Sequence, residues 1–162
     1  MRIALKCAVV LAGLLAADWA TSSSREVLPL TYQDDPRLLK LRRFFLDLHS
    51  PAFFVAEEFL SASDRNGLDW RLLPSLAIVE SGGGREGRHN NILGWDSCRQ
   101  KFPSVAIGIH HVAYRLGGSN LYKNKSLDQI LRAYNPHPGY PARVKSLMTS
   151  LSRDRLPRPP AQ

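Results

Sequence analysis

Apolar side chains recur at intervals of three and four positions along most of the chain after residue 35, a spacing that places them on one face of an α-helix. The first such segment opens at Pro36 and runs to about Leu48. The second opens at Ser50-Pro51, a capping serine before a first-turn proline, and stops near Gly67. Both segments predict amphipathic helices with one buried stripe.

The third segment is an apolar run that ends in a carboxylate and then in three glycines. Asp69 is a suitable N-cap. Pro74 would remove one backbone hydrogen bond and kink the helix, unless the helix begins later than Asp69. Glycines 82–84 should end it, because glycine is costly to hold in a helix. The buried face would carry Leu72, Leu73, Leu76 and Val79.

Glu80 therefore falls in the last turn of this helix, at the negative end of the helix dipole and beside an apolar core. Both surroundings disfavour the ionised carboxylate, so we expect the pKa of Glu80 to be raised. A carboxylic acid that stays protonated near neutral pH is what general acid catalysis needs. The same pattern is equally compatible with a solvated glutamate at a frayed helix end.

A long polar loop and three more helices are expected in the second half of the chain. Residues 85–100 form the loop, and its apolar residues Ile92, Leu93 and Trp95 predict that it folds back onto the body. Loops of this length inside a compact domain are usually functional or disordered.

The three later helices have clear boundary signals. Ser104 caps one that closes at the glycines 117–118, and a capping box at Ser126 opens the next, which runs through Tyr134. Residues 136–141 predict a rigid turn rich in proline and glycine. The last helix would carry the apolar residues Val144, Leu147, Met148 and Leu151. About six helices without a strand pattern predict a mainly α fold.

The two ends of the chain have a different character. Residues 1–20 combine a short basic start with an apolar stretch, which is typical of a secretory signal, and residues 21–35 predict a linker. An uncleaved anchor is the competing interpretation. The folded domain would span 36–153, and 154–162 would be a disordered tail. We expect an exported protein, periplasmic or secreted, with no stable membrane insertion once the signal is removed.

The formal net charge of +8 predicts attraction to anionic envelope polymers or membrane surfaces. Nucleic acid is not expected as a partner, since no basic motif interleaved with aromatic residues is present. Of the two cysteines, Cys7 lies in the predicted signal, so Cys98 would have no partner and is expected to be a small buried residue.

No cofactor and no metal site are expected. His110 and His111 are adjacent, so on a helix they point about 100° apart and do not share one ion easily. His49, His89 and His137 complete the set, and no His-Glu-x-x-His or paired-cysteine spacing occurs.

Three short motifs follow one another along the chain. Glu80-Ser81 comes after an apolar helix, a loop reads Asn-Asn-Ile-Leu-Gly-Trp over 90–95, and after a further helix the chain reads Ala-Tyr-Asn-Pro over 133–136. This order resembles the lysozyme-like superfamily, most closely the bacterial glucosaminidase-type domains and soluble lytic transglycosylases. Those families cleave the glycan strands of peptidoglycan. The resemblance spans roughly residues 51–151. The chain lacks the Gly-Leu-Met-Gln-type stretch typical of transglycosylases, which leaves open the bond that is cut.

The resemblance implies a role for each matching residue. Glu80 would protonate the scissile glycosidic oxygen, and Tyr134 would orient the substrate. A second carboxylate, where one is used, would be Glu86 or Asp96, and the sequence does not decide between them. Transglycosylases need a single acid because a sugar hydroxyl closes an anhydro ring. The residues implied to line the sugar cleft are Ser81, Asn91, Gly94, Trp95 and Asn135.

The expected function is therefore that of an exported, monomeric, lysozyme-like enzyme that cleaves peptidoglycan strands with Glu80 as the general acid. The alternative is a module on the same fold that binds glycan, or assembles with envelope partners, without turnover. A third interpretation is a basic exported scaffold without a glycan site.

Overall fold

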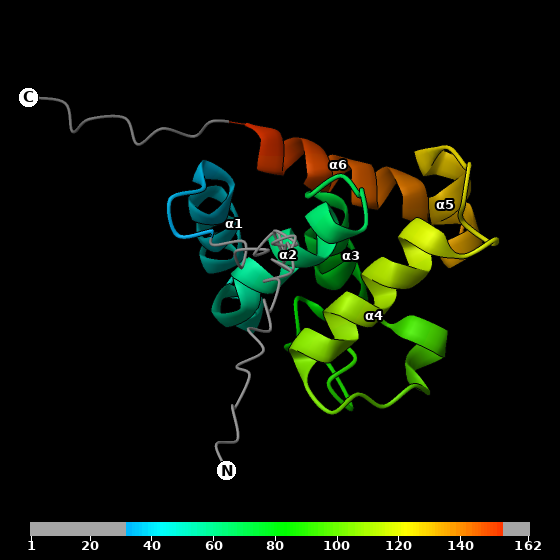
Figure 1. Cartoon of the computed structure of the whole chain (residues 1–162), viewed down its shortest axis with the longest axis horizontal. Coiled ribbons are helices and arrows are strands. Elements are labelled where there is room, and N and C mark those ends of the chain that lie inside the picture. Colours follow the sequence, from blue (N-terminus) through cyan, green and yellow to red (C-terminus); the bar gives the residue numbers. More distant parts are fainter. Residues whose placement is uncertain (1–31, 154–162) are drawn as a thin grey trace, which may run out of the picture.

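The computed structural model describes residues 32–153, and this part of the chain is mainly helical, as predicted (Figure 1). Strands are absent from the described range, which has one isolated bridge between Arg88 and Asn91. The predicted signal, most of the linker and the tail lie outside this range. The helices are α1 (Pro36–Asp47), η1 (Pro51–Val55), α2 (Ala56–Arg65), α3 (Leu72–Ser81), η2 (Trp95–Cys98), α4 (Val105–Gly118), α5 (Leu127–Tyr134) and α6 (Tyr140–Ser152), where η denotes a 3₁₀-helix.

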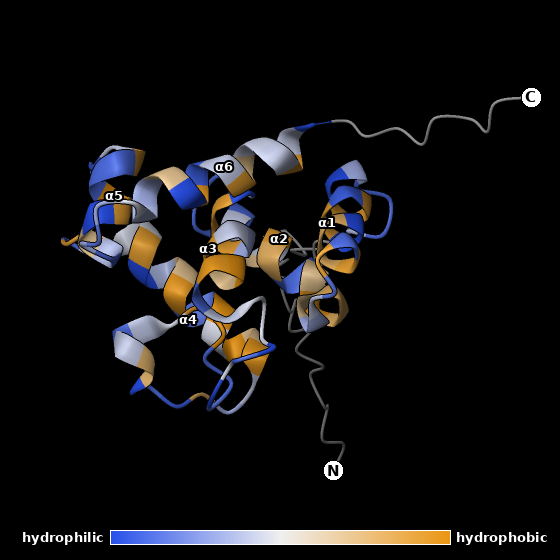
Figure 2. Cartoon of the chain, turned by 180° about the vertical axis from the view of Figure 1, so that it is seen from behind, coloured by the Kyte–Doolittle hydropathy of each residue, from blue (hydrophilic) through white to orange (hydrophobic). Residues whose placement is uncertain are grey.

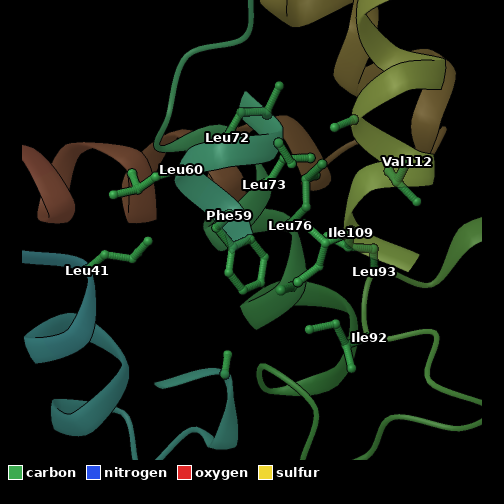
Figure 3. Packing of buried hydrophobic residues seen from close by; sticks show 14 of the residues in the cluster. Leu41, Phe59, Leu60, Leu72, Leu73, Leu76, Ile92, Leu93, Ile109 and Val112 are labelled. Carbon is green, nitrogen blue, oxygen red and sulfur yellow. The ribbon is translucent and has the colours of Figure 1, made fainter. Parts of the chain in front are cut away.

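Helix α3 lies at the centre of the molecule and contacts both α2 and α6 (Figure 1). Its residues from Leu72 to Ala77 are all buried, which is the expected fate of a helix that is apolar on nearly every side. Figure 2 shows the apolar residues of α3 and α4 in the middle of the fold. Figure 3 shows how Leu73 and Leu76 meet Phe59 of α2, Ile109 of α4 and Leu93 of the loop.

The N-terminus of α3 differs from the prediction. Asp69 does not cap the helix, because its carboxylate accepts a hydrogen bond from the Arg71 backbone N–H and the helix begins at Leu72. Pro74 is thus the third helical residue. At that position a backbone N–H would have no acceptor within the helix, so a proline costs no hydrogen bond. The helix therefore begins later than Asp69, which is the case in which the sequence predicted no kink at Pro74.

The C-terminus of α3 ends as predicted. Gly82 has a φ of 60°, in the left-handed region that residues with a Cβ adopt only at a cost, and its N–H bonds back to the carbonyls of Ala77 and Ile78. This sharp stop leaves Glu80 in the final turn of the helix, with the chain turning away immediately after it.

The remaining helix boundaries mostly follow the sequence signals. Ser104 caps α4, and Ser126 forms a complete capping box with Gln129 at the start of α5. The second predicted helix is divided into η1 and α2. The predicted turn over 136–141 is too long, since α6 begins at Tyr140 with a proline in its first turn.

The packed body begins before Pro36. Tyr32, assigned to the linker by the sequence, is buried, and its hydroxyl donates to Asp64 of α2 over 3.1 Å. Every described core residue lies between Tyr32 and Leu151, so a chain without residues 1–20 retains this whole core. Between residues 32 and 153, no helix has the length and apolar character that crossing a bilayer requires.

Candidate active site

A pocket of about 380 Å³ opens where the end of α3, the loop with η2, and the end of α5 converge. Its size is at the lower end of small-ligand sites. Five of the residues implied by the motifs contribute to its lining: Glu80, Gly94, Trp95, Tyr134 and Asn135. Tyr122, Asp96, Ser97 and Pro136 complete it.

The Glu80 carboxyl group is held from two sides. The hydroxyl of Tyr140, the first residue of α6, donates a hydrogen bond to Oε1 over 2.6 Å. Oε2 lies on the side of Gly94, in the loop. Because Oε1 already accepts from Tyr140, Oε2 is the oxygen free to hold the acidic proton.

The pKa of Glu80 is raised, as the sequence analysis predicted. Burial is the main cause, because it disfavours the charged carboxylate. The hydrogen bond from Tyr140 and the positive charge of Arg143 act in the opposite direction, since both favour the ionised form, but they do not outweigh burial. Glu80 is thus a partly desolvated acid rather than a fully solvated residue at a frayed end.

Gly94 is required by the position of Glu80. Its φ is 68°, and a Cβ built on it would overlap Oε2 of the Glu80 carboxyl group. The backbone of the loop can therefore approach the carboxyl group only because residue 94 has no side chain.

Aromatic rings form one wall of the site. Trp95 lies with its ring centroid 5.9 Å from that of Tyr134 and 6.4 Å from that of Tyr122. Tyr134 in turn stacks on Tyr140, with centroids 6.3 Å apart and planes 12° from parallel. Such rings present apolar faces and polar edges together, a combination suited to the apolar faces and hydroxyl groups of a sugar.

Tyr134 also fixes the loop. Its hydroxyl donates to the carbonyl oxygen of Leu93 over 2.5 Å, which ties the end of α5 to the residue before Gly94. Its ring lines the pocket, but its hydroxyl is engaged by the backbone rather than by Glu80. Tyr134 therefore positions the wall that faces the acid.

Ser81 and Asn91 were expected in the cleft but are not among the residues that line the pocket, and both are buried, with 4% and 1% of their surface exposed. The Ser81 hydroxyl donates to the Ile92 carbonyl over 2.7 Å and accepts from the Gly84 N–H. Ser81 thus fixes the loop against α3 and, like other buried polar groups, has its hydrogen-bond partners inside the protein.

The Asn91 amide closes the loop on itself. Its Nδ2 donates to the carbonyls of Trp95 and Gln100, and its Oδ1 accepts from the Trp95 N–H. Two of these hydrogen bonds hold the backbone of Trp95, which lines the pocket, and the third holds Gln100.

The two candidates for a second carboxylate are separated by the fold. Asp96 lines the pocket, where its Oδ1 pairs with Arg99 over 2.5 Å, whereas Glu86 is exposed and contributes nothing to the lining. Asp96 begins a run of three non-glycine residues with positive φ, continued by Ser97 and Cys98. Such strained backbone is frequent at functional sites.

Sequence reasoning missed Tyr140 and Tyr122. Tyr140 was assigned to a rigid turn, yet its place before Pro141 is a usable signal, because proline favours the first turn of a helix. Tyr122 lies in the turns after α4, where no helical spacing places it.

Cys98 is exposed, which corrects the expectation that it is buried. Within residues 32–153, no group of three histidine, cysteine, aspartate or glutamate side chains could hold a metal ion. His110 instead pairs with the half-buried Glu58 of α2, with Nε2 and Oε2 2.9 Å apart.

Replacing Tyr140 by phenylalanine is expected to raise the pKa of Glu80 further. The hydroxyl donates to the carboxylate and so favours the ionised form, and its removal leaves burial less opposed. NMR titration of the Glu80 carboxyl carbon measures the shift. Tyr134→Phe is the matched control, since that hydroxyl bonds Leu93 and not Glu80. A pKa that is unchanged or lowered in Tyr140→Phe would contradict the role given to the hydroxyl.

Comparison of the chain with protein-family models, curated proteins and solved structures found no match. The functional conclusion therefore rests on the residues of the site and on the order of the motifs.

Proposed function

We propose that this protein cleaves the glycan strands of peptidoglycan, with Glu80 as the general acid. The observation that supports the proposal best is Glu80 itself, a carboxyl group of raised pKa in a pocket walled by Trp95, Tyr122 and Tyr134. A desolvated acid opposite an aromatic wall has the elements that protonation of a glycosidic oxygen requires.

The chemistry requires one proton donor to begin. Glu80 would give its Oε2 proton to the bridging oxygen as the bond from that oxygen to the anomeric carbon breaks, leaving positive charge on the sugar ring. The charge is then quenched by the sugar's own hydroxyl or by water. In the one-acid route the sugar hydroxyl loses its proton to the Glu80 carboxylate, which restores the acid. Where Asp96 acts as the base, water loses its proton to Asp96, and Glu80 regains a proton from solvent.

Two routes follow from the identity of the nucleophile. An internal hydroxyl gives an anhydro sugar and needs no second carboxylate. Water gives a reducing end, and Asp96 is the side chain lining the pocket that could serve as a base or nucleophile. Glu86 is not proposed for this role, since it does not line the pocket.

The test is mass spectrometry of the soluble products formed from purified peptidoglycan by the chain that begins at Thr21, beside its Glu80→Gln variant. Muropeptides with either anhydro or reducing ends, absent from the variant, support the proposal. Anhydro ends assign the one-acid route, and reducing ends assign hydrolysis. Equal release by both proteins would remove Glu80 from the mechanism.

A glycan-binding module without turnover is the second candidate. The observation that favours it is the pair of influences from Tyr140 and Arg143, which stabilise the ionised carboxylate and so oppose an acid. Co-sedimentation with peptidoglycan without any released product would support this candidate. Failure to co-sediment at moderate salt, together with no product, would exclude both and favour a scaffold without a glycan site.

A further inference from the structure

A second surface of the molecule combines exposed apolar side chains with arginines. Helix α1 buries one stripe, Leu38, Leu41 and Phe45, yet Leu39 and Leu46 are 73% and 55% exposed. No residue of α1 lines the pocket. Figure 1 shows α1 at the end of the molecule opposite α5, so this surface is separate from the candidate active site.

The exposed leucines and two arginines share one face of α1. Leu39, Arg42, Arg43 and Leu46 follow the spacing of three, four and seven positions, which confines them to an arc of about 100°. All four are exposed. We call this set the outer face of α1.

Phe54 adds an aromatic ring to the same end of the molecule. It lies in η1, which packs against α1, and its side chain is 85% exposed. Its ring meets Phe53 edge-on, with centroids 5.5 Å apart. A single exposed leucine is ordinary on a protein surface, but two exposed leucines and adjacent arginines on one helix, with an exposed phenylalanine on the helix packed against it, form a combination found at membrane interfaces.

The local charge is positive. Asp47 is the sole acidic residue of α1, against four basic residues, Arg37, Lys40, Arg42 and Arg43. Arg37, in the first turn of the helix, pairs with Asp35 and Asp64. The outer face retains a net positive charge toward an anionic surface.

We propose that the outer face of α1, together with Phe54, is a peripheral docking surface for an anionic lipid membrane. A hydrated acidic polymer would satisfy Arg42 and Arg43 but would leave Leu39, Leu46 and Phe54 in water. A bilayer interface accepts both classes of side chain, because arginines meet lipid phosphates while apolar side chains enter the boundary with the acyl chains.

The position of α1 along the chain agrees with this occupant. It is the first helix of the described residues, and the 15 residues between the predicted export segment and Pro36 reach at most about 50 Å when extended. In a chain that has just crossed a membrane, or that retains its N-terminal segment, α1 is, among the described helices, the one nearest along the sequence to the lipid. The surface requires no spanning helix and is independent of the proposed activity.

The test is co-sedimentation of the chain that begins at Thr21 with vesicles of phosphatidylcholine containing about one-quarter phosphatidylglycerol, beside phosphatidylcholine alone. Circular dichroism and a cooperative melt establish that each variant is folded. We expect binding to the anionic vesicles that falls with added salt, and little binding to the neutral ones.

Two variants separate the contributions of charge and apolar contact. Arg42→Gln with Arg43→Gln is expected to weaken binding about 30-fold, and Phe54→Ser about tenfold. Lys123→Gln with Arg132→Gln makes the same change of charge away from α1 and should weaken it less than about threefold.

Three results would overturn the proposal. They are equal binding to neutral and anionic vesicles, equal weakening by the two charge-matched pairs, and no effect of Phe54→Ser. The last would mean that the surface responds to charge alone, as an acidic polymer would require.

Discussion

Replacing Glu80 by glutamine is expected to lower the rate of glycan release about 100- to 10,000-fold, the usual contribution of a positioned general acid. Glutamine keeps the shape of the side chain and can still accept the hydrogen bond from Tyr140, but it has no proton to give. Release of soluble products per unit time measures the loss. A variant within about tenfold of the unaltered protein would contradict the assignment of Glu80 as the acid.

The same variant makes a prediction about stability. Because the pKa of Glu80 is raised in the folded state, the folded protein favours the protonated form more than the unfolded chain does. The stability contributed by Glu80 is full below its ordinary pKa and is lost as pH rises through the raised value. In acid, the free energy of unfolding of Glu80→Gln should therefore equal that of the unaltered protein. At neutral pH it should be equal or higher.

The proposed activity should also fall as pH rises. The acid is competent only while protonated, so turnover should decline as pH rises through the raised pKa of Glu80. Denaturant unfolding at several pH values and a pH–rate profile measure the two effects. A variant that unfolds more readily at neutral pH than in acid, relative to the unaltered protein, would show that the charged carboxylate is stabilising.

Replacing Gly94 by alanine is expected to reduce turnover about 100-fold and to destabilise the fold by about 1–3 kcal/mol. The new methyl group would overlap the Glu80 carboxyl group and push it away from Tyr140, and the left-handed backbone would be strained as well. Product release and denaturant unfolding measure the two effects.

Gly67→Ala is the matched control for the backbone. Gly67 has a φ of 62°, close to that of Gly94, and a Cβ built there meets nothing within 4 Å. It should share the strain but retain full turnover. Equal loss of turnover in both variants would mean that the close approach of Gly94 to Glu80 has no catalytic consequence.

The sequence predicted the helical class, most helix boundaries and the position of Glu80, because capping residues and apolar spacing act locally. The prediction that Asp69 caps α3 was wrong. Asp69 lies two positions before the observed N-cap, Arg71, and its side chain forms a local turn with the Arg71 backbone, a bond that aspartate makes as readily as a helix cap. The start of α6 was missed because a proline-rich segment can be either a turn or a first helical turn, and only packing against α3 decides.

The candidate site was predictable in part for a similar reason. Motif order identified Glu80, Gly94, Trp95, Tyr134 and Asn135, all of which line the pocket. It could not separate them from Ser81 and Asn91, because a polar residue beside an acid can face a ligand or the backbone equally well. Tyr140 escaped notice because its contact with Glu80 joins residues 60 positions apart, and no local pattern records such a contact.

That long-range contact also makes the arrangement around Glu80 depend on a helix that is synthesised after α3. A chain that emerges from its N-terminus has completed α3, the loop and α4 before Tyr140 exists. Until α6 docks on α3, the Glu80 carboxyl group has no partner to orient it and the wall behind it is incomplete. We therefore expect the orientation of the Glu80 carboxyl group, and with it the proposed proton donation, to depend on the docking of α6.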